Sequence, residues 1–138
     1  MNHRVIPGLF VLLLTIFLAA CGGTTGSPNQ VNVTLSEFKI QSSQTNFTPG
    51  TTYHFVVTNN GHTSHEFMVM QPMSADMSMG QMDSMALYHI DASQLPPGAS
   101  KSFDYTFPAS AAKQPLEFAC HLPGHYEAGM HEVINARS

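Results

Sequence analysis

The sequence predicts an all-β protein, a Greek-key sandwich or small barrel of short strands. Aromatic and β-branched residues are spread through the chain after residue 30, and long runs of Ala, Leu, Glu and Lys are absent, which favours strands over helices. Short alternating apolar stretches are separated by Pro and Gly turns, as in sandwiches. The residues after position 20 suffice for one domain and leave no room for a second catalytic domain.

Residues 1–20 are predicted to be a secretory signal peptide. Arg4 supplies positive charge, and residues 9–20 form an apolar run. The run ends in Leu18-Ala19-Ala20-Cys21, which resembles the lipobox of bacterial lipoproteins. That resemblance implies cleavage before Cys21, acylation of Cys21 and a lipid anchor in the cell membrane. A transmembrane anchor is the alternative, although the run is short and lacks a charged stop-transfer flank.

The segment after the signal is expected to lie outside the cytoplasm. Residues 21–30 are rich in Gly, Ser and Thr and indicate a flexible tether, and residues 31–138 are expected to form the folded domain. Loss of Arg4 leaves four basic against nine acidic side chains, a formal charge of 4 − 9 = −5. No basic patch is present, so nucleic acid is not an expected partner. We expect a monomer.

The first two strands are expected at residues 31–40 and 51–58. Apolar residues alternate along residues 31–40 but change parity once near Ser36 and Glu37, which predicts a β-bulge. Pro49-Gly50 then forms a turn, and Tyr53 begins an apolar face along residues 51–58.

Four more strands are expected, interrupted by an insertion. Residues 65–70 predict a short strand with one apolar face, and residues 71–95 form a Met-rich insertion with a helical turn near residues 82–88. Residues 100–107 alternate strictly until Pro108. Residues 116–120 and 131–135 supply the last two strands.

A lone thiol follows the strand at residues 116–120. If Cys21 is acylated, Cys120 is the only thiol in a compartment where thiols oxidise. A disulfide between Cys21 and Cys120 is the alternative, although Cys21 lies on the tether and has its own signal context.

Cys120, His125 and Met130 share one tight loop that contains Pro123-Gly124. Soft sulfur ligands stabilise Cu(I), imidazole binds both oxidation states, and two His with one Cys and a weak axial Met are typical of electron-transfer copper. A second imidazole must come from elsewhere. His65 is preferred to His62 because the end of a strand positions a ligand better than a turn does.

Residues 118–130 resemble the copper loop of the plastocyanin and azurin family of blue copper proteins, the cupredoxins, and residues 64–67 resemble the upstream His motif of that family. The resemblance implies one copper ion, with His65, Cys120 and His125 as equatorial ligands and Met130 as the axial ligand. It also implies that the edge of His125 lies near the surface and passes electrons. Glu66 and His121 depart from the family pattern.

The predicted function is that of a one-electron carrier, with redox proteins as partners. Four protein ligands would leave no open position for a substrate, so we expect no catalytic turnover. A tetrahedral zinc site built from Cys120, His125, His65 and His121 is an alternative, although zinc has no need of Met130. Random packing of these residues is the remaining alternative.

The Met-rich insertion suggests a second possible function, copper handling. Seven methionines fall within eighteen residues: Met68, Met70, Met73, Met77, Met79, Met82 and Met85. Thioethers bind Cu(I), so this segment could deliver or buffer copper for acceptor proteins. Alternatively, its flexible side chains cover an apolar face of the sandwich.

Overall fold

The computed structural model describes residues 29–72 and 77–137, so the predicted signal peptide and Cys21 lie outside the described residues. The described part contains nine strands and one α-helix. The elements are β1 (Gln30–Ser36), β2 (Lys39–Ser42), β3 (Asn46–Phe47), β4 (Thr52–Asn59), β5 (Phe67–Met70), α1 (Met79–Met85), β6 (Tyr88–Ile90), β7 (Ser100–Thr106), β8 (Leu116–Ala119) and β9 (His131–Ala136). Short 3-10 helices span Ala92–Gln94 and Ala109–Lys113.

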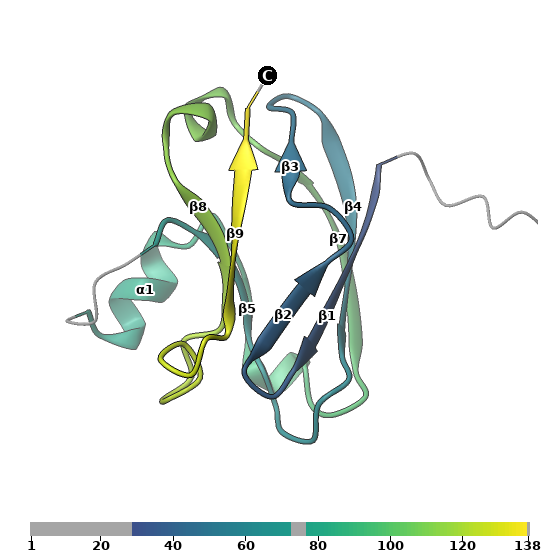
Figure 1. The fold of residues 1–138 in the computed structure, drawn as a ribbon, viewed down its shortest axis with the longest axis vertical. Coiled ribbons are helices and arrows are strands. Elements are labelled where there is room, and N and C mark those ends of the chain that lie inside the picture. Colours follow the sequence, from purple (N-terminus) through teal and green to yellow (C-terminus); the bar gives the residue numbers. More distant parts are fainter. Residues whose placement is uncertain (1–28, 73–76, 138) are drawn as a thin grey trace, which may run out of the picture.

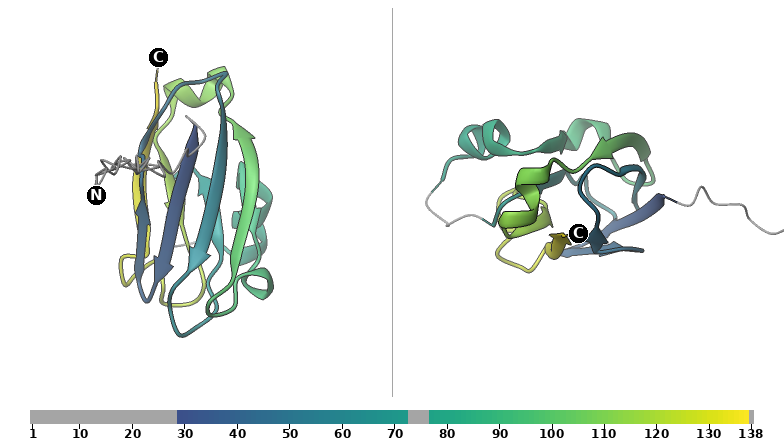
Figure 2. Two further views of the ribbon diagram at one scale, coloured as in Figure 1. Left: turned by 90° about the vertical axis from the view of Figure 1, so that its right-hand side faces the viewer. Right: turned by 90° about the horizontal axis from the view of Figure 1, so that it is seen from above.

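The strands form two sheets. The first sheet has the order β2-β1-β4-β7, in which β1 and β4 are parallel. The second has the order β3-β9-β8-β5-β6, in which β3 and β9 are parallel. Figures 1 and 2 show the sheets as two layers, with α1 outside the second. The all-β sandwich prediction is confirmed.

A cluster of aromatic rings fills the space between the sheets. Phe47 stacks on Phe107 with ring centroids 4.7 Å apart, and its edge contacts Phe118. Phe55 and Phe67 also pack against Phe118. All five rings are buried, and each buried phenyl ring stabilises the fold by roughly 1.5–3 kcal/mol.

The first predicted strand is two strands, and the predicted bulge is wrong. β1 and β2 form an antiparallel hairpin, in which Ser36 pairs with Lys39 and Leu35 pairs with Ile40. The two residues between them form the turn, where Phe38 adopts a φ of 61°. A two-residue turn and a one-residue bulge both shift the buried residues from odd to even positions in the sequence. The apolar pattern alone therefore does not distinguish a turn from a bulge.

The prediction of one apolar face for residues 65–70 is also wrong. The strand β5 begins at Phe67, and all four of its residues are buried. Phe67 and Val69 face the main core, whereas Met68 and Met70 form a second cluster with Ala119. Met82 on α1 packs against that cluster. The helix therefore covers the outer face of β5, and the sequence pattern could not show this cover.

The Met-rich insertion contains a helix and a strand. The helix α1 lies a few residues before the predicted helical turn, and Gln81 accepts a hydrogen bond from the Ser78 N–H at 3.0 Å. β6 then pairs with β5, and the Tyr88 ring stacks on Phe103 at 3.7 Å. The strand β6 was missed because its apolar residues are too few to show a period. None of the helices in the described ranges is long and apolar enough to cross a membrane.

The buried carboxyl of Glu117 on β8 should make the stability of the protein depend on pH. Burial raises the pKa of this carboxyl above 4.5, although Tyr126 and His131 act in the opposite direction. Below the unfolded pKa both states are protonated, and the contribution of the protonated side chain to stability is fully present. As the pH rises through the folded pKa that contribution is lost. The stability of Glu117→Gln relative to the parent protein should therefore increase as the pH rises above about 4.5.

Urea unfolding of both proteins at several pH values measures this difference. Glu127→Gln is the matched control, because Glu127 is exposed, and it should change the stability by no more than about 0.5 kcal/mol. A Glu117→Gln difference that is independent of pH would contradict the expectation.

Candidate metal centre

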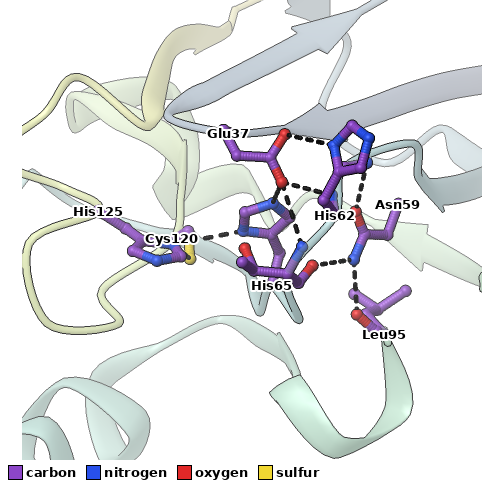
Figure 3. Close-up of polar contacts among 9 residues, drawn as sticks. Glu37, Asn59, His62, His65, Leu95, Cys120 and His125 are labelled. Carbon is purple, nitrogen blue, oxygen red and sulfur yellow. Dashed lines mark hydrogen bonds and ion pairs between the residues drawn. The ribbon is translucent and has the colours of Figure 1, made fainter. Parts of the chain in front are cut away.

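Three donor atoms from two distant segments meet at one end of the sandwich. The Nδ1 atoms of His65 and His125 lie 3.3 Å apart, and the Cys120 Sγ lies 3.5 Å from the His125 Nδ1. One donor atom from each of the three residues lies within 4.8 Å of the other two. Figure 3 shows the three side chains pointing toward one another. The centre lies at the end of the molecule opposite the C-terminus (Figure 1).

The loop between β8 and β9 carries Cys120, His125 and Met130. The Cys120 N–H donates to the Met130 carbonyl at 3.1 Å, and the Met130 N–H donates to the His125 carbonyl at 3.0 Å. Gly124 adopts a φ of 82°, which a residue without Cβ adopts at little cost. These bonds fold the loop back on itself, so that His125 returns beside Cys120.

Met130 lies at the base of this loop, immediately before β9. Its side chain is fully buried and belongs to the main core cluster together with Cys120. The two peptides are joined by the Cys120 hydrogen bond, so the two sulfur-bearing residues are neighbours in the fold. Met130 remains a predicted axial ligand.

Asn59 holds the loop that presents His65. Its side-chain amide donates to the carbonyls of Thr63 and Leu95, both at 2.8 Å, and its Oδ1 accepts from the Gly61 N–H at 2.8 Å. The His65 N–H also donates to the Leu95 carbonyl. Asn59 and His65 are both fully buried. His65 thus lies in a braced loop before β5 rather than in a strand (Figure 3).

Glu37, in the turn between β1 and β2, closes the far side of His65. Its carboxylate accepts from the backbone N–H groups of His62 and Thr63. The His62 bond is the main cause of a pKa lowered to about 2, so Glu37 is an anion at neutral pH. Its Oε1 lies 3.9 Å from the His65 Nε2. A negative carboxylate there favours a proton on Nε2 and leaves Nδ1 free to bind a metal.

Gly61 is required where Glu37 and His65 approach each other. A Cβ at Gly61 would lie 2.7 Å from a Glu37 carboxylate oxygen and 2.8 Å from the His65 Nε2. Any side chain at this position would therefore push the imidazole or the carboxylate out of place.

Burial sets the protonation of the donors. It lowers the pKa of His65, and the neighbouring His125 acts in the same direction, which favours a neutral imidazole with a free lone pair. Burial also raises the pKa of the Cys120 thiol to about 11. A metal that binds the thiolate must therefore displace its proton.

These donors fit a copper ion. Donors about 2.0–2.3 Å from one ion lie roughly 3.3–3.8 Å apart when the angles between the bonds are about 110–120°, and the two shortest contacts lie in that range. Two imidazoles with one thiolate suit copper, and a nearby thioether favours it over zinc. The same three donors alone would also hold zinc.

Other histidines considered from the sequence lie elsewhere. His62 is 95% exposed and faces Glu37 rather than the donor atoms. The His121 ring stacks on Tyr126 with centroids 4.3 Å apart, while the backbone N–H of His121 donates to the Glu66 carboxylate at 2.6 Å. His131 lies beside Glu117. The structure therefore brings His65, and not His62, to Cys120 and His125.

Glu37, Asn59 and Glu66 support the site but were not identified as its supports. Glu37 fell in the supposed bulge, and Asn59 appeared only as part of a turn signal. Glu66 was noted as a departure, and its bond to the His121 N–H now shows that it joins the two segments that carry His65 and Cys120. Asn59 lies two residues after Val57, at the next position of the alternating buried face of β4, and that alternation was a signal that could have been used.

His125 connects the centre to the surface. It is partly exposed, whereas His65 and Cys120 are fully buried. The Phe38 ring packs edge-on against it with centroids 5.4 Å apart, and Phe38 is 47% exposed. An apolar ring thus flanks the exposed imidazole.

The fold is that of the cupredoxins. An auracyanin from Roseiflexus castenholzii superposes with a TM-score of 0.61 at 18% identity, covering 82% of this chain and all of that one. A rusticyanin from Thiobacillus ferrooxidans gives 0.56 at 16% identity over 80% of this chain and 79% of that one. An azurin from Methylomonas sp. strain J gives 0.52 at 15% identity over 81% and 100%. The predicted cupredoxin resemblance is confirmed for the fold.

Two curated relatives are copper-resistant cuproproteins named CopI. The one from Pseudomonas aeruginosa is 26% identical, with 93% of this chain and 94% of the relative covered. The one from Vibrio cholerae is 32% identical over 62% of this chain, which spans about half, 51%, of that relative. No protein-family model matches the chain.

Proposed function

We propose that this chain is an extracytoplasmic copper protein that carries one electron at a time. His65, Cys120 and His125 would be the equatorial ligands of a single ion, and Met130 the axial ligand. The observation that carries the proposal is the convergence of two Nδ1 atoms and one thiol sulfur in a single site. Copper bound there would supply a reversible couple between Cu(II) and Cu(I).

The surrounding residues suit electron transfer. Asn59 and the loop hydrogen bonds hold the donors in one geometry, so the ligands need little rearrangement when the charge of the ion changes. Burial of Cys120 and His65 keeps water from the ion. The partly exposed His125, with Phe38 beside it, is where a partner redox protein would dock.

The optical and EPR spectra of the protein loaded with Cu(II) test this function. We expect an intense visible thiolate band and a narrow copper hyperfine splitting, because a short bond from copper to sulfur delocalises the unpaired electron. A spectrum typical of ordinary tetragonal Cu(II) would contradict the carrier function.

Copper handling is the second candidate. Two relatives are named copper-resistant cuproproteins, and Met68, Met70 and Met82 share one cluster beneath α1. A reversible potential with fast self-exchange favours the carrier, whereas rapid copper transfer to an apo acceptor favours handling. Cu(I) titration of Cys120→Ala tests a thioether site, since a stoichiometry of zero would exclude one.

The lipid anchor remains part of the proposal. It rests on Leu18-Ala19-Ala20-Cys21 alone, which would attach the domain to the outer side of the cell membrane through the tether. Membrane fractionation of cells that express the whole chain tests it, because a Cys21→Ser protein should no longer be lipidated.

A further inference from the structure

A second group of metal-binding side chains lies near α1. Glu66 precedes β5, Asp83 belongs to α1, and His89 lies in β6. One donor atom from each of the three residues lies within 4.8 Å of the other two. Three separate segments therefore bring two carboxylates and one imidazole together, and the copper ligands proposed above are not among them.

The spacing of these groups is too wide for direct hydrogen bonds. The His89 Nε2 lies 3.7 Å from a Glu66 oxygen, and the His89 Nδ1 lies 3.8 Å from an Asp83 oxygen. Hydrogen bonds of this type measure about 2.7–3.2 Å. The His89 Nε2 is buried and has no hydrogen-bond partner among the described residues. An ion can bind only one nitrogen of an imidazole. Donors about 2.0–2.2 Å from one ion lie roughly 3–3.8 Å apart, and the distance between the His89 Nε2 and the Glu66 oxygen lies in that range.

The backbone holds the three side chains in place. Glu66 is only 3% exposed, and one of its oxygens accepts from the His121 N–H. His89 pairs with Met68 across β5 and β6. The Asp83 side chain is 43% exposed, so an ion could enter from that side and keep water as a further ligand.

We propose that Glu66, Asp83 and His89 bind one divalent ion, separate from the thiolate centre. One nitrogen and two carboxylate oxygens, without sulfur, suit Zn²⁺ or Cu²⁺ rather than Cu(I). The chain would then hold a soft, redox-active ion at Cys120 and a borderline divalent ion beside α1. This inference goes beyond the proposed electron transfer and does not depend on it.

Zinc titration of the whole mature chain, with its thiolate centre first filled by Cu(I), tests the second site. Calorimetry should show one further equivalent of Zn²⁺ per chain. Asp83→Asn and His89→Ala should each weaken that binding by at least about tenfold. The visible band of the reoxidised Asp83→Asn protein should stay unchanged. Ca²⁺ should not replace Zn²⁺, because an imidazole ligand disfavours it.

His54→Ala is the matched control, because His54 and Asp104 form another His–Asp pair, 2.6 Å apart, far from α1 in the sequence. It should leave zinc binding intact. Equal zinc affinity in the parent and His89→Ala proteins would overturn the site. A loss of affinity in His54→Ala as large as that in His89→Ala would also overturn it, because it would indicate an adventitious ion only. Since Asp83 is on the surface, Asp83→Asn tests the site even if His89→Ala fails to fold. If the thiolate centre does not take up copper, the zinc affinities of the parent and variant proteins are compared without copper, and a loss of affinity in Asp83→Asn still supports the second site.

Discussion

Replacing Cys120 with serine should abolish the intense visible band of the copper-loaded protein completely. The band requires a thiolate bound to Cu(II), and Cys120 is the only cysteine among the described residues. A hydroxyl oxygen in its place is a hard ligand that holds Cu(I) poorly. Any Cu(II) that still binds through the two imidazoles should show the wide hyperfine splitting of an ordinary site. Absorption and EPR spectra after loading with one equivalent of copper measure both changes.

Two histidine variants complete this experiment. His65→Ala should also lose the narrow hyperfine splitting, because the His65 Nδ1 is one of the three converging donors. His62→Ala is the control, since this exposed imidazole faces Glu37, and it should keep the band of the parent protein. A visible band that survives in Cys120→Ser, or that depends on His62, would contradict the proposed ligand set.

Replacing Asn59 with alanine should lower the free energy of unfolding by about 2–4 kcal/mol. The change removes three hydrogen bonds at a fully buried position and leaves the Gly61 N–H and the Thr63 carbonyl without their partner. Each buried group left unpaired costs roughly 1–3 kcal/mol. Urea unfolding of the copper-free protein measures the loss of stability.

The same variant should also release copper faster, because Asn59 braces the loop that presents His65. Copper transfer to a chelator measures that rate. Asn32→Ala is the control, since Asn32 is an exposed amide on β1, and its stability should change by no more than about 0.5 kcal/mol. An Asn59→Ala protein as stable as the control would show that the three bonds do not brace the loop.

Much of the fold could be predicted because burial leaves a regular pattern along a strand. Tyr53, Phe55 and Val57 alternate in the sequence, and all three are buried on one face of β4. Glycine and proline turns placed most strand ends within two residues. The pattern failed at Glu37 and Phe38, where a turn and a bulge have the same effect on parity. It also failed for β5, because a strand that is covered on both faces has no polar side.

The proposed metal ligands could be named from the sequence for a different reason. Cys120, His125 and Met130 lie on one short loop with a turn inside it, so their proximity follows from local chain geometry and from the chemistry of their donor atoms. The sequence by itself therefore determined the all-β class, this loop and the preference for copper. It could not determine which histidine completes the site, because His65 and His125, sixty positions apart, meet only when β5 pairs with β8.

Only the tertiary structure showed that His65 reaches Cys120 and His125, that Glu37 lies beside the His65 Nε2, and that Asn59 holds the loop that carries His65. The contacts among Glu66, Asp83 and His89 were likewise decided by packing, since they join a loop, a helix and an edge strand. The physical reason is the range of the interactions. Alternation of apolar residues and turn preference depend on near neighbours along the chain. Hydrogen bonds between distant loops and shared metal ligands depend instead on the positions of backbone segments that are far apart in the sequence.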